Sequence, residues 1–511
     1  MQRDVPIGSV DGEPPAFIGR GDGLEAPREG GERLPAGSTA NYFQTREKLL
    51  TRRAVLWLGQ TCNIRCHFCY FLDRIENKDH PEHQFMDLKK AKEICYVLRH
   101  RYGNTSIDIQ GGEPTIWRHI DELVAYCHEI GLYPTLITNA IALARREKCE
   151  QLQKAGLRDL LISVQGLGAV YDEIVGLPGG SVKQAQALQN CVELGIPFRF
   201  NCVLSLKALP QYVDIARLAV SKGALAVNFL AFNPFEDQAT GKRSTFNVPR
   251  YSDVAVELNK ALDVLAEGGV EANVRYFPIC MVEERHRKSM YNFYQLSYDA
   301  HEWDYDSWSW TGQQPQRMKW GGTSEHNASL AAITYNSWVF ANRVGRVSGR
   351  FVHNVKIRVN QMLAPFPATR ETVKKVYHSV VAYTRRMKYP VRRNGNVGTG
   401  YIVTDELNRN PQVYRDHAMV RALDHCDYQY STRCDECDVK SICDGFHGDY
   451  ASLFGSDEAR PIHTGTKVTD PLYFIGDQMK IYEPEEASRP FRRTEPLAAG
   501  VTRAPHLALG R

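Results

Sequence analysis

The sequence predicts an α/β fold in which a parallel sheet closes partway into a barrel. Strand-like and helix-like segments alternate six times between about residues 50 and 270, and cysteine, glycine and amide residues recur where the strands end. Alternation of this kind favours a parallel sheet. In barrels of parallel strands the chemistry lies at the carboxyl ends of the strands. The sequence therefore predicts one functional site at that end.

The six expected strands are short apolar runs. In chain order they are residues 54–60 (AVLWLGQ), 105–110, 133–138 (YPTLIT), 158–164 (RDLLISV), 197–204 (PFRFNCVL) and 224–231 (ALAVNFLA). The helices are expected near residues 87–101, 118–131, 143–155, 181–194, 210–222 and 250–267.

Three cysteines follow the first strand at the spacing Cys62-x-x-x-Cys66-x-x-Cys69. Three thiolates can hold a [4Fe–4S] cluster that needs four ligands, which leaves one iron open to a small chelating ligand. Zinc is the alternative for these cysteines. A zinc site needs a fourth ligand close by, and His67 and His80 are available.

A second motif, Gly111-Gly112-Glu113-Pro114, follows the strand SIDIQ. Two glycines allow the backbone to approach a ligand closely. Glu113 supplies a carboxylate that can accept hydrogen bonds from a ligand ammonium group. By itself the motif also suits an ordinary turn, so its weight comes from its position after the cysteines.

Together the two motifs, with Phe68 just before the third cysteine, resemble those of the radical S-adenosylmethionine (radical SAM) enzymes. The resemblance covers roughly residues 50 to 280 and implies a TIM-like partial (β/α)6 barrel. It implies that the open iron binds the methionine part of S-adenosylmethionine, and that reduction yields a 5′-deoxyadenosyl radical that removes a substrate hydrogen atom. The implied cluster ligands are Cys62, Cys66 and Cys69, and the implied cofactor contacts are Phe68, Gly111, Gly112, Glu113, Pro114, Asn139, Ser163 and Gln165. Three asparagines are candidates to contact the cofactor or the substrate, and each fits a helix cap or a loop equally well: Asn139, Asn201 and Asn233.

A second cysteine group, Cys434-x2-Cys437-x5-Cys443, lies downstream, and Cys280 follows the barrel region. This pattern resembles the C-terminal extension called SPASM, or its shorter form, twitch. The resemblance implies one auxiliary [4Fe–4S] cluster with these four cysteines as ligands. His447 stands where the two-cluster pattern has a cysteine. A structural zinc site is the alternative, with Cys426 and His447 as reserve ligands.

Five cysteines fall within expected helices or strands and are expected to be core residues: Cys95, Cys127, Cys149, Cys191 and Cys202. No catalytic residue is assigned, except that Cys202 is a candidate hydrogen-atom donor for an epimerase.

Two further segments stand out between the barrel and the second cysteine group. Four of the seven tryptophans lie within residues 303 to 320, where they form either a core cluster or a wall of the substrate cavity. Residues 341–400 hold thirteen Lys or Arg and one acid, Glu371. This stretch is either a solvated face or a surface for an anionic partner.

The composition is ordinary for a soluble globular protein: 43% hydrophobic and 24% charged residues over 511 residues, with a net charge of +4. No apolar run is long enough to span a membrane, and the N-terminus lacks the apolar core of a secretory signal. The thirteen cysteines are spread over a large chain without a signal, which favours reduced thiols and a cytoplasmic location.

The expected organisation has five parts. Residues 1–45 are expected to be disordered, 50–275 to form the barrel, 276–425 to be a linker or insertion, 426–480 to bind the auxiliary cluster and 485–511 to be a flexible tail.

The function predicted from these observations is that of a radical SAM oxidoreductase that oxidises its substrate with the help of the auxiliary cluster. The preferred substrate is a small anionic metabolite such as a nucleotide-linked or phosphorylated sugar, because residues 1–50 are too short and too rich in glycine and proline for a leader-binding domain. A peptide-modifying enzyme and a redox-neutral epimerase are alternatives. The expected partner is an electron donor such as flavodoxin or ferredoxin. A zinc-stabilised nucleic-acid-binding protein is a remote alternative, and it predicts steeply salt-dependent binding.

Overall fold

A computed structural model describes residues 42–49, 53–69, 71–80, 83–100, 104–231, 245, 247–296, 298–299, 306–308, 428–483 and 490–491, and the structural account is confined to them. Asn233, Cys426, the basic stretch 341–400 and most of the tryptophan-rich segment lie outside the described residues.

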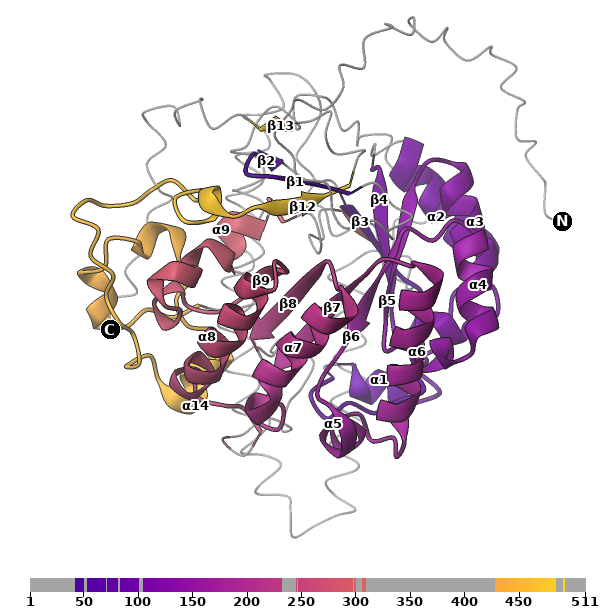
Figure 1. The fold of residues 1–511 in the computed structure, drawn as a ribbon, viewed down its shortest axis with the longest axis horizontal. Coiled ribbons are helices and arrows are strands. Elements are labelled where there is room, and N and C mark those ends of the chain that lie inside the picture. Colours follow the sequence, from indigo (N-terminus) through magenta and orange to yellow (C-terminus); the bar gives the residue numbers. More distant parts are fainter. Residues whose placement is uncertain are drawn as a thin grey trace, which may run out of the picture.

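The centre of the molecule is a nine-stranded sheet in the order β10-β9-β8-β7-β6-β5-β4-β3-β11 (Figure 1). Every neighbouring pair of strands in it is parallel. The strands are β3 (Arg53–Trp57), β4 (Ser106–Gln110), β5 (Tyr133–Thr138), β6 (Asp159–Ser163), β7 (Phe198–Leu204), β8 (Ala226–Ala231), β9 (Glu271–Arg275), β10 (Met290–Tyr291) and β11 (Asp306–Trp308). The predicted α/β class and the six predicted strands, which are β3 to β8, are confirmed.

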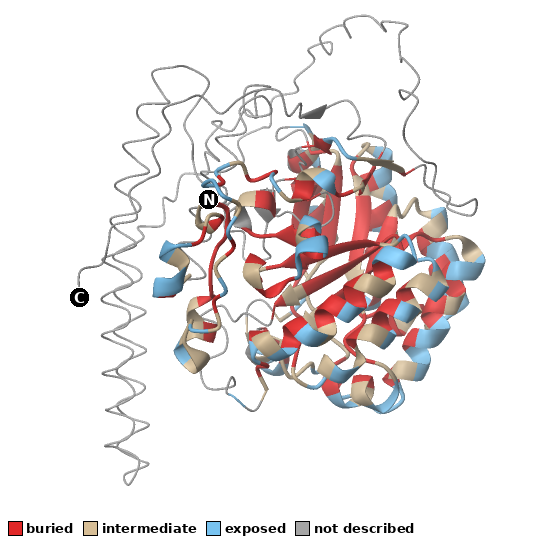
Figure 2. Ribbon diagram, turned by 60° about the vertical axis from the view of Figure 1, so that its left-hand side comes forward, coloured by how far each residue is buried: buried red, intermediate tan, exposed pale blue. Residues whose placement is uncertain are grey.

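The helices cover one face of this sheet, where they bury its apolar side chains (Figures 1 and 2). Ala54 and Leu56 of β3 and Ile107 and Ile109 of β4 belong to the resulting core. The helices are α1 (Leu72–Glu76), α2 (Leu88–His100), α3 (Ile120–Glu129), α4 (Arg146–Lys154), α5 (Gly168–Val175), α6 (Gly180–Leu194), α7 (Tyr212–Lys222), α8 (Tyr251–Glu267), α9 (Phe293–Leu296) and α14 (Gly448–Phe454). The six predicted helices are α2, α3, α4, α6, α7 and α8. No helix among the described residues is long and apolar enough to cross a membrane.

The sheet has more strands than the six predicted, because β9 and β10 extend it at one edge and β11 extends it at the other. The sequence EANVR of β9 alternates polar and apolar residues, and all five are buried. Its polar side chains are buried on the inner face, which is the face of the sheet away from the helices. β10 and β11 are two and three residues long, too short for a periodicity to show.

The two ends of the described chain pair with each other, which corrects the predicted boundaries of the disordered segments. β1 (Phe43–Thr45) pairs antiparallel with β12 (Lys480–Tyr482), and β2 (Lys48–Leu49) pairs antiparallel with β13 (Pro490–Phe491). Residues 43–45 and 490–491 were expected to lie in a disordered segment and a flexible tail. Single strands this short gain their order only from a partner distant in sequence, which a local pattern cannot indicate.

Buried charges join these ends to the inner face near the amino ends of the strands. Arg53 contacts Asp108 at 2.9 Å and Glu483 at 2.6 Å. Arg199 contacts Asp159 at 2.9 Å. Farther along the sheet, Lys480 of β12 lies 2.7 Å from Glu271 and 2.8 Å from Asp299, and Arg275 also pairs with Asp299. Because breaking one partner of a buried pair leaves an uncompensated charge, this ionic layer fixes the chain ends to one end of the barrel.

Asp108 gives the ionic layer a predicted pH dependence. Burial raises its pKa to about 6, although Arg53 opposes the shift. The folded pKa therefore lies above the unfolded value of about 4, so the stabilising contribution of the protonated form is present below pH 4 and is lost as the pH rises through 6. The free energy of unfolding of Asp108→Asn relative to wild type is expected to rise by about 3 kcal/mol from pH 4 to pH 7. Urea unfolding of both proteins across this range checks it. A constant difference would mean that Asp108 titrates normally.

The cysteine-rich segment after residue 427 packs against the end of the barrel. The Tyr450 ring of α14 stacks on Tyr251 of α8 with centroids 3.6 Å apart, and its hydroxyl accepts a hydrogen bond from the Tyr251 backbone N–H. The Asn292 side-chain oxygen accepts from the Asp444 N–H at 2.9 Å. These contacts bring the downstream cysteines to the segment that carries Cys280.

Candidate active site

The loop with Cys62, Cys66 and Cys69 leaves the carboxyl end of β3, and all three side chains are half-buried. Its middle is held by α5, a helix that the sequence analysis missed. The Arg65 N–H donates to the Val175 carbonyl at 2.7 Å, and the His67 N–H donates to the Ile174 carbonyl at 3.2 Å. The Arg65 guanidinium donates to the Cys62 carbonyl at 2.9 Å. Phe68 packs against the main hydrophobic core. The conformation of the cysteine loop is thus fixed by tertiary contacts of its middle with α5 and by the packing of Phe68.

Gly111 and Gly112 end β4 and lie directly on the backbone that leads into the cysteine loop. The Gly112 N–H donates to the Gly59 carbonyl at 2.7 Å, and the Glu113 N–H donates to the Thr61 carbonyl at 2.9 Å. A Cβ at Gly111 would lie 2.2 Å from the Gly59 oxygen, and one at Gly112 would lie 2.1 Å from the Thr61 oxygen. The described contacts therefore give the glycines a second reason, close approach to another strand end, and their contact with a ligand stays a prediction.

Glu113 is buried, and its carboxylate accepts four hydrogen bonds from the chain. One oxygen, Oε1, accepts from the Thr115 N–H at 3.0 Å and from the hydroxyls of Thr115 and Thr138 at 2.5 and 2.6 Å. The other, Oε2, accepts from the Asn139 N–H at 2.7 Å. Burial raises the pKa of Glu113, and these hydrogen bonds oppose the shift. Glu113 ties the end of β4 to the end of β5, and Oε2 retains a lone pair for a further donor.

Asn139 links the end of β5 to the cysteine loop. Its Nδ2 donates to the Asn63 Oδ1 at 2.8 Å, and its Oδ1 accepts from the Ile141 N–H at 3.0 Å. The Gln184 Nε2 of α6 lies 3.0 Å from the Asn139 carbonyl, the Ser163 carbonyl and the Tyr171 hydroxyl. Sequence reasoning missed Asn63, Gln184 and Tyr171, because no motif marks residues whose partners are distant in sequence.

Ser163 and Gln165 lie at the end of β6, as expected. Gln165 uses both ends of its side chain to hold β7: its Oε1 accepts from the Val203 N–H at 2.8 Å, and its Nε2 donates to the Asn201 carbonyl at 3.3 Å. Asn201 lies opposite Ser163 in the sheet. The structure therefore brings these residues together, and their contact with the cofactor stays a prediction.

Cys202 does not face the site, which contradicts its selection as a hydrogen-atom donor. It is fully buried in the core between the sheet and the helices. It also raises the pKa of Tyr212 of α7, after the larger effect of burial, so it lies on the helix side of β7. Successive residues of a strand point to opposite faces, so the neighbours Asn201 and Val203 lie on the inner face instead.

The residues of the cysteine loop fit a [4Fe–4S] cluster. Burial raises the pKa of Cys62 to about 12, with a further contribution from the nearby Glu113 carboxylate. The pKa of Cys66 is raised by burial and then by Cys69 and Cys62, so the three thiols share one environment. Iron ions would supply the positive charge that three close thiolates need. In the described part of the chain no three His, Cys, Asp or Glu side chains converge on a point for a single ion. Each cysteine of a four-iron cluster binds a different iron, so its ligands need not converge.

The four cysteines of the predicted auxiliary site come together around one small cavity. It is lined by Cys280, Cys434, Cys437 and Cys443, with Lys440 and Arg460 nearby. The Cys443 sulfur accepts from the Gly445 N–H and the Cys437 sulfur from the Ile462 N–H, both at 3.4 Å. Burial, with a smaller contribution from Cys434 and Cys437, raises the pKa of Cys280 to about 11. Four cysteine sulfurs with backbone N–H donors suit a fully ligated iron–sulfur cluster.

His447 lies outside the lining of this cavity, although it was considered as a reserve ligand. Its Nδ1 accepts from the Asp449 N–H at 3.2 Å, so it caps the start of α14. The expected core cysteines Cys95, Cys127, Cys149 and Cys191 are buried, which confirms their placement, and the described cysteines are all free thiols.

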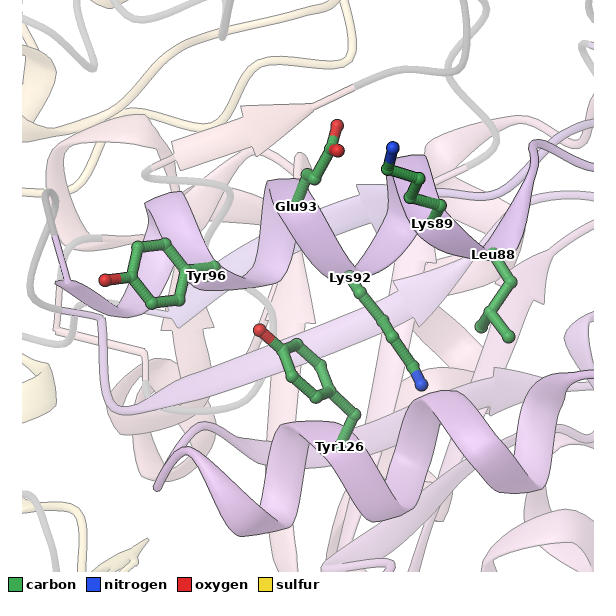
Figure 3. Close-up of a pocket in the computed structure, with 6 residues that line it drawn as sticks. All are labelled: Leu88, Lys89, Lys92, Glu93, Tyr96 and Tyr126. Carbon is green, nitrogen blue, oxygen red and sulfur yellow. The ribbon is translucent and has the colours of Figure 1, made fainter. Parts of the chain in front are cut away.

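A separate hollow lies on the outer surface between α2 and α3 (Figure 3). Lys92 and Tyr126 line it, with the Lys92 Nζ 5.4 Å from the Tyr126 ring centroid. Lys92 also pairs with Glu122 at 2.8 Å. The hollow is on the helix layer, away from the strand ends that carry the cysteines, and we assign it no role in the site.

Comparison with known proteins identifies the motif-bearing region. Residues 58–218 match the model of the radical SAM superfamily. The PqqA peptide cyclase of Rhodopseudomonas palustris is 37% identical over 190 residues, which are 37% of this chain and 48% of that protein. The AdoMet-dependent heme synthase of Oleidesulfovibrio alaskensis is 26% identical over 204 residues, 40% of this chain and 51% of that one. The chain thus spans about half the length of the curated relatives it matches.

Among solved structures, that of Streptococcus suis SuiB bound to S-adenosylmethionine covers 44% of this chain and 50% of that chain, at 21% identity and a TM-score of 0.36.

Proposed function

Because residues 58–218 form a radical SAM domain, whose cofactors are S-adenosylmethionine and a [4Fe–4S] cluster, we propose that this protein is an enzyme that oxidises a peptide substrate. Cys62, Cys66 and Cys69 hold the catalytic cluster, and Cys280, Cys434, Cys437 and Cys443 hold a second one. When bound, the clusters supply one-electron chemistry, at the first site the reductive cleavage of S-adenosylmethionine and at the second an acceptor for an electron from the substrate.

The observation that carries the proposal is the packing of the glycine motif on the cysteine loop. The Gly112 N–H and Glu113 N–H bind the carbonyls of Gly59 and Thr61. The cofactor-binding residues therefore stand beside the cysteines, as cleavage of the cofactor requires. Glu113 Oε2 is available for the ammonium group of the methionine, and Asn139, Ser163 and Gln165 occupy the adjoining strand ends.

A peptide replaces the anionic metabolite as the preferred substrate. The buried cations of the inner face, Arg53, Arg199, Arg275 and Lys480, are each paired with a carboxylate. They are therefore poorly suited to bind a phosphate group. Relatives that bear the name PqqA peptide cyclase recur among the similar proteins, at 37% and 31% identity. The basic stretch 341–400, which favoured an anionic partner, lies outside the described residues.

Buried residues around the site exclude water from the cysteine loop. Tyr171 and Gln184 are buried below the cysteine loop, and Glu113 is buried beside it. Excluding water protects a reactive radical from side reactions. A redox-neutral epimerase is less well supported, because Cys202, its candidate hydrogen donor, lies on the helix side of β7.

The test is anaerobic incubation of the reduced protein with S-adenosylmethionine and a peptide encoded beside the gene. We expect 5′-deoxyadenosine to form and the peptide to lose the mass of two hydrogens. Nucleotide-linked sugars serve as the comparison substrates. If they alone stimulate 5′-deoxyadenosine formation, the peptide assignment is wrong. If the protein forms no 5′-deoxyadenosine with any substrate, the radical reaction itself is wrong.

A further inference from the structure

Four small polar side chains form a row across the inner face of the sheet. Ser163 of β6 lies opposite Asn201 of β7, Asn201 lies opposite Asn228 of β8, and Asn228 lies opposite Asn273 of β9. Along β7 the row lies two residues beyond Arg199, and along β6 it lies four residues beyond Asp159, the partner of Arg199. On β6 and β7 it therefore lies between the Asp159–Arg199 pair and the strand ends that carry the cofactor motifs.

The orientation of the amides in this row is fixed from one end. The Lys480 ammonium group can only donate hydrogen bonds, and it lies 2.8 Å from the Asn273 Oδ1. The Asn273 Nδ2 consequently faces the other way, and it donates to the Asn228 Oδ1 at 3.0 Å and to the Glu271 Oε1 at 2.8 Å. The Asn228 oxygen is thus occupied, and its Nδ2 is turned away from Asn273.

The next two polar atoms in the row have no hydrogen-bond partner. The Asn228 Nδ2 is a buried donor without an acceptor, and the Asn201 Oδ1 is a buried acceptor without a donor. Asn228 is 0% exposed and Asn201 is 9% exposed. Each buried unsatisfied group costs about 1–3 kcal/mol. Native chains satisfy nearly all such groups with protein or ordered water, so a donor and an acceptor left open on neighbouring strands point to a polar partner that binds both.

We propose that Asn201 and Asn228 bind an amide group of the substrate, a proposal that rests on the peptide function above. An amide offers one acceptor, its carbonyl oxygen, for the Asn228 Nδ2 and one donor, its N–H, for the Asn201 Oδ1. A carboxylate or phosphate at neutral pH offers acceptors alone and would leave the Asn201 oxygen facing an anion. Binding an amide here would place the peptide beside Ser163, at the strand end next to the cofactor-binding residues.

The test uses two activity-free measurements on the complete, cluster-loaded protein. Asn201→Leu replaces an amide with an unsatisfied oxygen by an apolar side chain of similar size, so we expect Tm to stay constant or rise. Asn228→Leu also removes the acceptor of the Asn273 Nδ2, so this variant is used only in the second measurement. The matched control is Asn190→Leu. The Asn190 amide is fully used, with its Nδ2 on the carbonyls of Leu143 and Ala144 at 2.9 and 3.1 Å and its Oδ1 accepting from Gln186. Its loss is expected to lower Tm.

The second measurement uses acetamide as the probe. Acetamide is expected to raise the Tm of the wild type by about 2 °C when present at several times its Kd. N,N-dimethylacetamide, which has no N–H, and acetate, which has no donor, are expected to have no such effect. Both leucine variants should lose the response to acetamide, and Asn190→Leu should keep it.

The inference is overturned if acetamide has no effect on the wild type, or if Asn201→Leu lowers Tm as much as the control. That result would mean an ordered water fills the row. Because neither measurement needs a peptide, a positive acetamide response with no peptide product would contradict the proposed function and leave the amide site standing. A peptide product with no acetamide response would support the proposed function and contradict the amide site.

Discussion

Replacing Cys62, Cys66 and Cys69 together with alanine is expected to lower the iron content of anaerobically prepared protein from about eight to about four atoms per chain. The reason is the separation of the two cysteine groups: one lies on the loop after β3, and the other lines a cavity between the segment at Cys280 and the downstream residues. Formation of 5′-deoxyadenosine is expected to fall to background in the same variant.

The reciprocal variant, with Cys280, Cys434, Cys437 and Cys443 replaced, is expected to lose the other four irons and to keep cleavage of S-adenosylmethionine. Iron, sulfide and zinc analyses with electron paramagnetic resonance spectra check both results. Cys202→Ala is the control, because this cysteine lies in the apolar core, away from both cysteine groups. About four irons in the wild type, with zinc in the reciprocal site, would assign the downstream cysteines to zinc and remove the proposed electron acceptor.

Gly112→Ala is expected to lower the iron content of the catalytic site by at least half while leaving the second site intact. A Cβ at this position would lie 2.1 Å from the Thr61 carbonyl oxygen and 2.7 Å from the Gln60 carbonyl carbon. Both are backbone atoms, so no side chain can move aside. The loop that carries Cys62 must then separate from the glycine motif, at a cost of about 1–3 kcal/mol or more.

Gly223→Ala provides the control for this result. Gly223 has a φ of 70°, and a Cβ there would meet no heavy atom within 4 Å. The substitution adds backbone strain of about 1–2 kcal/mol far from the cysteine loop, so a lower Tm with full iron content is expected. If Gly112→Ala also keeps its full iron content, the close approach of the two strand ends is not what positions the cysteines.

The strands and helices of the barrel were predictable because each is a local pattern. The apolar runs of β3 to β8 are buried on both faces, and the six long helices between them bury the outer face. The edge strands and the paired chain ends were not predictable. β1 and β12 are separated by more than 400 residues and are three residues long, so only their partner gives them order.

The candidate site divides in the same way. The cysteine spacing and the glycine motif indicate the region that matches the radical SAM model, and the cysteine pattern indicates the group of Cys280, Cys434, Cys437 and Cys443 that lines one cavity. The sequence could not show that Cys202 lies on the helix side of β7, because the face on which a buried residue lies depends on the register of its strand.

The sequence by itself determined the residue types of the site, their order and the class of chemistry, because ligand identity and spacing are covalent properties of the chain. The tertiary structure decided which of these residues act together. Only folding packs Gly112 on the backbone of Thr61, brings the hydroxyl of Thr138 and the N–H of Asn139 to the Glu113 carboxylate, and leaves the Asn201 Oδ1 and the Asn228 Nδ2 without partners. These are contacts between strand ends far apart in sequence, and their strength depends on burial, which no local pattern of residues encodes.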